Sequence, residues 1–289
     1  MVTRRFLLRN RVGFTTSIEE QPLAVAAGTY IDYFSIAIVG QLATGTTVPI
    51  ALFLDLINPF QYKVNGIPWI SLTGRDIFAL DVYLLRHVPQ VIEGAAGQQD
   101  KVQGLRVPLW HKVAPAEAIS WLTTRQAVTN VSGEIISIGY ETREKGVTDA
   151  RYDIRVVTGT SPATTGVATA VPDLPRMGNL IGILLFSGTV PTATAETTTL
   201  QEVRLFRNDV QELTAEWNEL KSSQPNSVDG TLTIPARAVI ENYNFIDLSD
   251  DPWDLSKDRA RVDILFGVAN SPYKVIPIYL TTARPRPQS

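Results

Sequence analysis

Short apolar runs dominate the chain and point to β-structure. β-Branched and aromatic residues gather in runs bounded by Gly, Pro, Asn or Thr-rich turns. Some runs alternate apolar and polar positions, which is typical of a sheet with one face in water. We therefore expect a mainly antiparallel protein. The predicted strands of the first series are Tyr30–Val39, Val48–Leu56, Phe60–Val64, Leu105–Trp110, Glu134–Tyr140 and Arg151–Val157, and those of the second are Leu180–Phe186, Leu200–Phe206, Gly230–Ile234, Val239–Leu248, Arg261–Val268 and Lys274–Thr281.

Two segments instead carry apolar residues at the three- and four-residue spacing of an amphipathic helix. The first is Gly74–Arg86 and the second is Asn208–Lys221. Each follows a predicted strand directly and begins beside a polar residue that can cap a first helical turn, Thr73 in one case and Asn208 in the other. We therefore expect two short helices that flank the sheets.

The order of these elements indicates a weak internal repeat. An apolar strand closed by glycine opens each series, a strand with its helix follows, and further strands end it. Two copies of one fold would keep order and spacing in this way after long divergence, and chance similarity between strand-rich segments is the alternative. The matched segments are 30–40 with 178–188, 71–80 with 204–213, and 134–140 with 262–268, and the closing strands start at Tyr152 and Tyr273.

Residues 158–177 separate the two series. They consist largely of Thr, Pro and small residues without apolar periodicity, which is typical of a linker or an extended loop. We expect a boundary near Pro172, with a first domain over 1–171 that includes an N-terminal arm and a second domain over 172–289. A β-sandwich with one flanking helix fits a jelly roll, so the predicted fold class is all-β, with tandem jelly-roll β-sandwiches forming a double jelly roll.

The repeat, the paired helices and the segment DLPRMGNLIGILLFSG over 173–188 give the chain a family resemblance. Over nearly its whole length it resembles the double jelly-roll major capsid proteins of icosahedral viruses with an internal membrane, the lineage of tectiviruses, corticoviruses and adenoviruses. The resemblance implies a homotrimer that forms a pseudo-hexagonal capsomer, with neighbouring capsomers, other coat proteins and the internal membrane surface as partners. It also implies a protein that is made in the host cytoplasm and resides in the virion capsid.

Composition argues against other classes of function. The 289 residues are 44% apolar and carry a formal net charge of −3, so the chain can bury a sizeable core and no specific nucleic-acid partner is expected. There is no Cys, and His87 and His111 lie in no zinc-ligand or catalytic-triad pattern. No apolar stretch is long enough to cross a bilayer, and residues 1–11 do not read as a secretory signal. We expect a structural protein without enzymatic activity.

One acidic stretch has the residue types of a metal site. Clustered carboxylates supply the hard oxygen ligands that Ca²⁺ prefers, so a structural Ca²⁺ ion is one interpretation. The spacing departs from an EF-hand loop because Pro252 and Trp253 interrupt it, and a solvated turn is the other interpretation. The residues concerned are Asp247, Asp250, Asp251, Asp254 and Asp258.

The N-terminal arm is strongly basic. Arg4, Arg5, Arg9 and Arg11 occur with no acidic residue before Glu19, and apolar residues lie among them. Such a segment can contact anionic lipid headgroups or a neighbouring chain. It can also be a first β-strand with its Arg side chains outward, and the two interpretations are compatible.

Two other interpretations remain open. A carbohydrate-binding or glycan-processing double β-sandwich would use Trp69, Trp110, Trp121 and Trp253 as sugar-stacking platforms, although burial is the commoner fate of Trp. The chain could also be a capsid protein with a single upright jelly roll and an added domain, partnered by a second coat protein.

Overall fold

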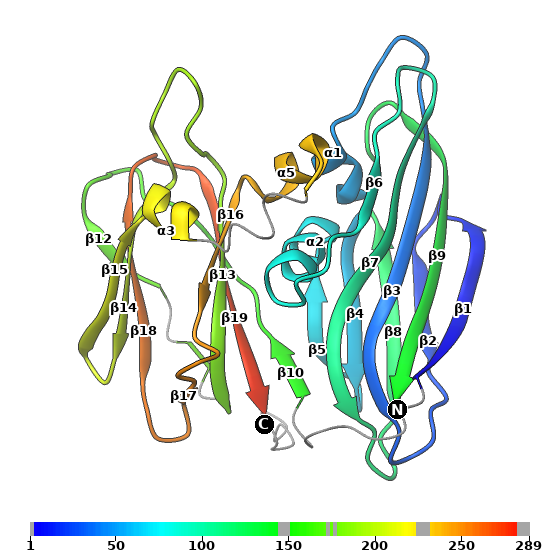
Figure 1. Cartoon of the computed structure of the whole chain (residues 1–289), viewed down its shortest axis with the longest axis horizontal. Coiled ribbons are helices and arrows are strands. Elements are labelled where there is room, and N and C mark those ends of the chain that lie inside the picture. The colour runs from blue at the N-terminus through cyan, green and yellow to red at the C-terminus, as the bar shows by residue number, and fades with distance from the viewer. Residues whose placement is uncertain (1–2, 144–150, 172–173, 176–177, 224–231, 282–289) are drawn as a thin grey trace. The chain divides into compact units, whose positions relative to one another are not determined.

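The chain forms two compact units (Figure 1), here called unit 1 and unit 2. The structure is a computed structural model that describes residues 3–143, 151–171, 174–175, 178–223 and 232–281. Unit 1 comprises 1–152 together with 227–240, and unit 2 comprises 153–226 together with 241–289. All strand pairs defined by their register are antiparallel, so the expected antiparallel all-β class is confirmed.

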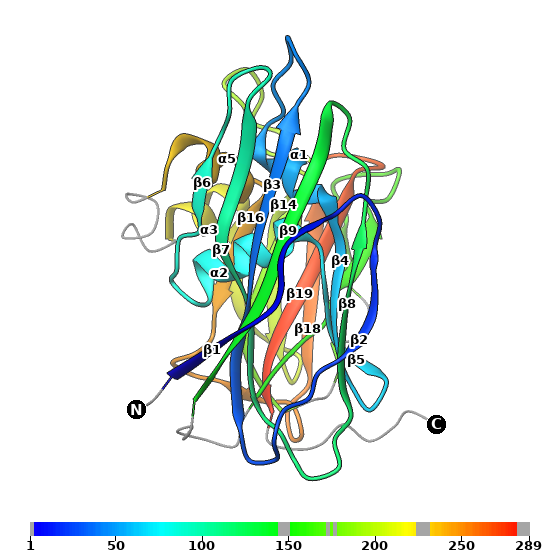
Figure 2. The ribbon, with the colours of Figure 1, turned by 90° about the vertical axis from the view of Figure 1, so that its right-hand side faces the viewer.

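Unit 1 is a sandwich of two sheets. The first, sheet A, has the strand order β1 (Thr3–Gly13), β9 (Val131–Arg143), β3 (Tyr30–Leu42), β7 (Gln99–Lys112) and β6 (Gln90–Ile92). The second, sheet B, has the order β2 (Ile18–Pro22), β8 (Ile119–Arg125), β4 (Ile57–Val64) and β5 (Ile67–Leu72). Figure 2 looks onto sheet A and shows β1 beside β9.

Aromatic rings join the two sheets of unit 1. Phe34 on β3 is fully buried, and its ring centroid lies 5.3 Å from that of Phe60 and 5.8 Å from that of Tyr62, both on β4. Trp121 on β8 and Tyr140 on β9 lie at 6.2 and 6.0 Å from the same ring. Because alternate residues of a strand face opposite sides, these positions fall on one face of each sheet and form the core between them.

Short helices complete unit 1. They are α1 (Ile50–Phe53) with the 3₁₀ turn η1 (Leu54–Leu56), α2 (Gly74–Tyr83) and α5 (Ile234–Ile240), and α5 packs on α1, α2 and β6. The predicted helix at Gly74 is confirmed, and it begins with a capping box in which Thr73 and Asp76 each accept a hydrogen bond from the other's backbone N–H. Within the described residues, the structure contains no helix with the length and apolar character of a membrane span.

Unit 2 is also a sandwich of two sheets. Sheet C has the order β10 (Arg151–Ile154), β19 (Pro272–Thr281), β13 (Asn179–Ser187) and β16 (Tyr243–Asp247), with β11 (Val157–Thr160) paired to β19 and β17 (Trp253–Asp254) paired to β13. Sheet D has the order β12 (Ala168–Ala170), β18 (Ala260–Phe266), β14 (Leu200–Arg207) and β15 (Val210–Glu216). The helix α3 (Trp217–Ser223) follows β15 directly.

The two units share one topology. The order β1-β9-β3-β7 in sheet A corresponds to β10-β19-β13-β16 in sheet C, and β2-β8-β4-β5 in sheet B corresponds to β12-β18-β14-β15 in sheet D. Each unit also places a helix directly after the last strand of its second sheet, α2 after β5 and α3 after β15. The repeat inferred from the sequence is therefore confirmed at the level of topology. The match of 30–40 with 178–188 aligns β3 with its counterpart β13.

The other two segment matches of the repeat are wrong, because each pairs an element of unit 1 with the neighbour of its true counterpart in unit 2. Segment 71–80 runs from β5 into α2, whereas 204–213 spans the β14–β15 hairpin, whose counterpart is the β4–β5 hairpin. Segment 134–140 lies in β9, whose counterpart is β19 and not β18. Tyr152 lies in β10, the first strand of the second series, so β9 closes the first one.

The helix predicted over Asn208–Lys221 is wrong for most of its length. Asn208 and Asp209 both adopt positive φ, 52° and 65°, and form the two-residue turn of a β-hairpin. Residues 210–216 then pair with β14, and the helix begins only at Trp217. The helical spacing in the sequence is a coincidence of two elements: Leu213 on the strand is half-buried, Trp217 and Leu220 on the following helix are buried, and Val210 is exposed.

One predicted strand is helical, and another is not found. Residues 48–56 form α1 and η1, which bury Ile50, Phe53 and Leu54 at helical spacing after Pro49. The strand predicted over 230–234 is not found in its described part, where α5 begins at Ile234, and residues 230–231 lie outside the described residues. The strand predicted over 239–248 is confirmed over 243–247 as β16, with 239–240 in α5.

The expected linker is part of unit 2. β11 begins one residue before this stretch, with Val157 opposite Val275 on β19, and β12 lies within the stretch and pairs with β18. These pairings satisfy the backbone hydrogen bonds of a Thr-rich segment whose side chains show no apolar periodicity. The two units divide between Tyr152 and Asp153, earlier than the boundary expected near Pro172.

Candidate functional site

The basic arm is the edge strand β1 of sheet A. Thr3–Leu7 pair with β9 in regular register, and register shifts follow around Arg9. Arg4, Arg5 and Arg11 are exposed, and Arg9 is half-buried. The β-strand interpretation of the arm is therefore confirmed, and its charges line an outer edge of unit 1.

The arm's charges find neutral partners within the fold. Arg5 donates to Ser35 Oγ at 3.1 Å and Arg9 donates to Gln21 Oε1 at 2.9 Å. Across the residues that the structure describes, no carboxylate lies within ion-pair distance of Arg5, Arg9 or Arg11. Two neighbours are exposed apolar residues, Phe6 at 41% and Leu7 at 59%. β1 thus presents cations and apolar side chains together.

Local partners hold the carboxylates of the acidic stretch. Asp247 accepts hydrogen bonds from the backbone and hydroxyl of Ser249, and Asp254 accepts from Ser256 and Lys257. The hydrogen bond from Lys257 is the main reason that the pKa of Asp254 falls to about 2. These short-range partners turn the carboxylates away from a common centre.

The remaining carboxylates of this stretch are also separate. Asp258 binds Arg207 at 2.7 Å and Asn208 at 2.7 Å, Asp251 lies 3.6 Å from Arg207, and Asp250 is exposed. Within the described ranges, no group of three His, Asp or Glu side chains is arranged to hold a metal ion. This arrangement favours the solvated-turn interpretation, and the Ca²⁺ interpretation of Asp247, Asp250, Asp251 and Asp254 stays a prediction for a binding measurement to decide.

The four Trp side chains proposed as sugar platforms are mostly buried. Trp69, Trp121 and Trp253 are at most 3% exposed, so their faces are closed to a sugar ring. Trp69 instead carries the Arg151 guanidinium 3.7 Å from its ring centroid. Trp110 is 37% exposed, and its ring stacks on Tyr152 at 5.2 Å. Burial therefore removes three of the four candidate sugar platforms and leaves Trp110 alone.

The two histidines belong to packed polar networks. His111 on β7 is 1% exposed, with its Nδ1 2.5 Å from the Tyr62 hydroxyl and its Nε2 3.0 Å from Glu117 Oε2. Glu117 also accepts from the backbone N–H of Ala114 at 2.7 Å. Burial lowers the pKa of His111, which keeps the ring neutral so that it accepts at Nδ1 and donates at Nε2.

The second histidine forms a simpler pair. His87 Nδ1 lies 3.0 Å from both carboxylate oxygens of Asp81, which also accepts from the backbone N–H of Arg106. In the part of the chain that is described, neither histidine hydrogen-bonds a Ser or Thr hydroxyl. Sequence reasoning missed the His111 network because its members come from different elements with no common spacing.

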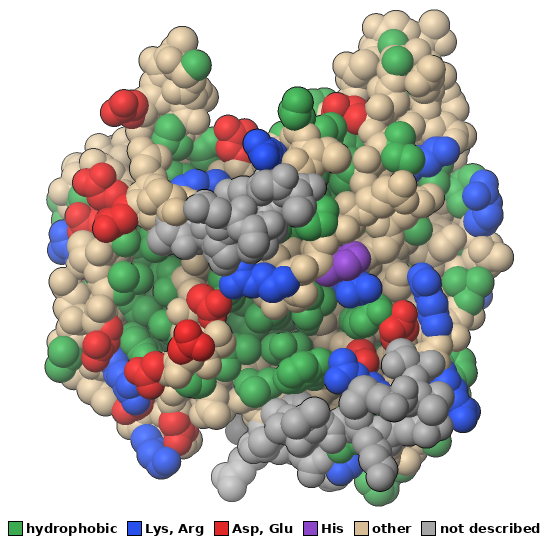
Figure 3. All heavy atoms as spheres, in the orientation of Figure 1, with side chains coloured by type: hydrophobic (Ala, Val, Ile, Leu, Met, Phe, Trp, Pro, Cys, Tyr) green, Lys and Arg blue, Asp and Glu red, His purple; other side chains and the backbone are tan. Residues whose placement is uncertain are grey.

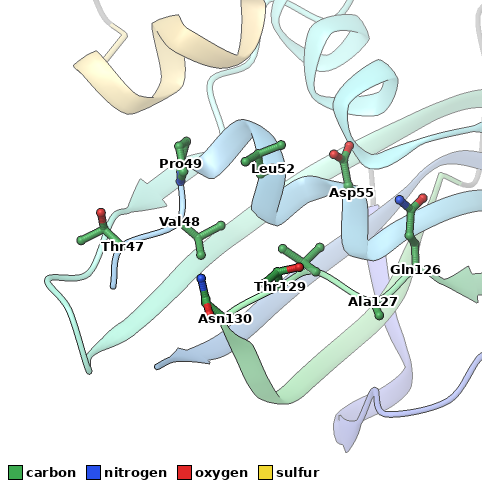
Figure 4. Close-up of a pocket in the computed structure, with 10 residues that line it drawn as sticks. Thr47, Val48, Pro49, Leu52, Asp55, Gln126, Ala127, Thr129 and Asn130 are labelled. Atoms are coloured by element: carbon green, nitrogen blue, oxygen red, sulfur yellow. The ribbon is translucent and has the colours of Figure 1, made fainter. Parts of the chain in front are cut away.

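A shallow pocket of about 300 Å³ lies beside α1 (Figure 4). Its lining includes Leu52 and Asp55 on one side and Gln126 and Asn130 on the other. Asp55 is already paired with Arg75, whose Nε donates to it at 2.7 Å. The pocket therefore offers amides, threonine hydroxyls and apolar surface beside a carboxylate that is already paired.

Comparison with solved structures identifies the fold. The chain matches the major capsid protein of Sulfolobus Turreted Icosahedral Virus with a TM-score of 0.75 and 12% sequence identity, over 98% of this chain and 97% of that chain. The fold is that of double jelly-roll major capsid proteins. The expected double jelly roll is therefore confirmed, and a single jelly roll with an unrelated added domain is wrong because both units have the same strand order.

Two further capsid proteins share the double jelly-roll fold. VP54 of PBCV-1 matches with a TM-score of 0.60 and 9% identity, over 96% of this chain and 93% of that chain. The major capsid protein P2 from Bacteriophage PM2 matches with a TM-score of 0.58 and 11% identity, over 97% of both chains. No protein-family model and no curated protein matches the sequence.

Proposed function

We propose that the chain is a structural capsid protein that assembles through pseudo-hexagonal homotrimers into the shell of an icosahedral virus. The observation that carries the proposal is the extent of the fold match, which covers 98% of this chain and 97% of the capsid protein of Sulfolobus Turreted Icosahedral Virus. Both chains are thus almost entirely double jelly roll. The site of action is then the virion, and the partners are further copies, neighbouring capsomers and other coat proteins.

Native mass and imaging test this proposal. Sedimentation velocity or light scattering of the purified chain should give a capsomer of three times the chain mass of 31.8 kDa. Electron microscopy should show threefold particles and, at higher concentration, sheets or shells. A protein that stays monomeric at every concentration and never joins a lattice would contradict the proposal.

The basic arm is part of the same proposal. Arg4, Arg5, Arg9 and Arg11 would contact a neighbouring chain or the internal membrane, because an exposed row of cations gains most from a partner outside the fold. Replacing all four by Ser should leave the folded unit intact but weaken attachment to capsomers or to anionic vesicles. Attachment that is indifferent both to this substitution and to salt would contradict the arm's role.

A further inference from the structure

We propose that the basic edge strand β1 of one copy docks along the acidic edge strand β15 of a second copy. This inference rests on the proposed capsid function, because it names the surfaces through which copies would meet. The contact is between two molecules, with β1 from unit 1 of one copy and β15 from unit 2 of the other.

The two strands are the longest open edges of the sheets. β1 has 11 residues and β15 has 7, whereas the other outermost strands of the described sheets, β6, β2, β5, β10, β12 and β16, have 3, 5, 6, 4, 3 and 5. An edge strand presents a row of backbone N–H and C=O groups without a strand partner, which makes it a template for another strand. Long edges therefore need either a shield or a partner.

β1 has cations that the fold does not neutralise. Arg5 and Arg9 reach only a hydroxyl and an amide oxygen, and Arg11 has no ion-pair partner among the described residues. Next to them, Phe6 and Leu7 expose apolar surface. The segment Thr3–Leu7 keeps regular register with β9, so the backbone groups on its outer edge follow the regular spacing that another strand requires.

β15 has the opposite character. Glu212 and Glu216 are exposed, and neither has a cation within ion-pair distance in the described part of the chain. The neighbouring Val210 is 61% exposed, which provides apolar surface to match that of β1. The carboxylates of the 247–258 stretch are less suitable, since Asp254 and Asp258 already have cationic partners within unit 2.

The net charges of the two units differ in the same direction as the charges of the two strands. Acidic and basic residues are nearly equal in number in unit 1, whereas acidic residues exceed basic ones by four in unit 2. Figure 3 shows acidic side chains gathered over unit 2 on the face in view. A basic strand from another copy is therefore attracted to unit 2 as a whole as well as to β15.

The charges also select one arrangement. Two β1 strands would repel each other, as would two β15 strands, while β1 and β15 attract. Each copy has one strand of each kind, so the favoured contact is heterologous, with β1 of every copy on β15 of the next. Contacts of this kind close into a ring such as a trimer.

A charge swap in the full chain tests the inference. The β1 variant carries Arg5→Glu, Arg9→Glu and Arg11→Glu, and the β15 variant carries Glu212→Arg and Glu216→Arg. Each should lower the self-association constant measured by sedimentation about tenfold or more, because attraction becomes repulsion at several pairs. The combined variant, with all five changes, should recover association to within about threefold of the original chain.

Controls separate docking from other effects. The variant with Glu196→Arg and Glu241→Arg makes the same charge change as the β15 variant at exposed sites off the edge strands, and it should associate like the original chain. Thermal melts should show that every variant stays folded. For the original chain, raising the salt from 0.1 to 1 M shortens the Debye length from about 10 to about 3 Å and should weaken association.

Three results would overturn the inference. Association could survive both single-strand variants, or the combined variant could stay as weak as each alone. The β1 variant could also associate normally but lose binding to phosphatidylserine vesicles, which would assign the arm to a membrane. These outcomes differ from failure of the capsid function itself, in which the unmodified chain does not associate at all.

Discussion

Replacing Tyr62 by Phe removes one hydroxyl from the His111 network and leaves the rest of the ring in place. Tyr62 is 1% exposed, and its hydroxyl is 2.5 Å from His111 Nδ1. Nε2 of the same ring is engaged by Glu117 at 3.0 Å, so the ring cannot turn to satisfy Nδ1 without losing that bond. The variant therefore leaves a buried acceptor without a donor.

The expected loss follows from that unsatisfied atom. Leaving a buried acceptor unpaired costs about 1–3 kcal/mol of unfolding free energy. For a unit of this size, each kcal/mol lowers the melting temperature by about 2–4 °C. Urea unfolding followed by Trp fluorescence measures the change, because the Trp69 ring lies 5.0 Å from that of His111 and reports on unit 1.

The matched control makes the same chemical change where no hydrogen bond is lost. Tyr279 is fully buried in unit 2, and its hydroxyl has no hydrogen-bond partner among the described residues. Tyr279→Phe should leave stability unchanged or raise it slightly. If Tyr62→Phe lowers the unfolding free energy by less than about 0.5 kcal/mol, the account of the network is wrong. It is also wrong if Tyr279→Phe lowers the unfolding free energy by as much as Tyr62→Phe does.

Three further predictions address the core, the pH dependence and metal binding. Phe34→Ala, at the centre of unit 1, should lower the unfolding free energy by about 3–5 kcal/mol. Phe6→Ala, at a position that is 41% exposed, should change it by less than about 1 kcal/mol. Equal effects of the two variants in urea unfolding would contradict the assigned core. Burial lowers the pKa of His111, so the folded protein favours the neutral ring. The stability that the neutral ring contributes is therefore present above the unfolded-state pKa of about 6.5 and is lost as the pH falls below it. The stability difference between the original chain and His111→Gln should therefore shrink between pH 7.5 and 5.5, and a constant difference would refute the assignment. Excess Ca²⁺ or EDTA should leave the melting temperature unchanged because Asp247 and Asp254 bind their neighbours, and a rise with Ca²⁺ would reinstate a site there.

Most strands predicted from local patterns are present, and so is α2, because the alternation of strand residues and the capping residues of a helix lie in neighbouring positions. Several short strands, such as β2 and β12, were not predicted. The same reasoning failed at Asn208 and Asp209, where two left-handed residues form a hairpin turn inside a segment with helical spacing. Local patterns also could not predict which strands pair, since partners such as Thr3 and Arg143 are far apart in the sequence.

The candidate site was predicted in part for the same reason. The cations of β1 were evident because they lie close together in the sequence, whereas their position at a sheet edge depends on the distant β9. Of the two interpretations of the acidic stretch, the structure favours the solvated turn, because Ser249 and Ser256, two residues after Asp247 and Asp254, donate hydrogen bonds to the carboxylates. The network of Tyr62, His111 and Glu117 joins β4 of sheet B, β7 of sheet A and a loop, so no local sequence pattern predicts it.

The place of α5 in the chain bears on how the protein is made. α5 lies between α3 and β16, both of unit 2, yet it packs on α1 and α2 and buries Val239 and Ile240 in unit 1. A ribosome must therefore synthesise the roughly 70 residues from 153 to 226 before unit 1 can be completed, which at about 5–20 residues per second takes about 4–15 s. During that interval the nascent chain exposes the apolar faces of α1 and α2, so chaperone binding and aggregation should be greatest before residue 240 emerges.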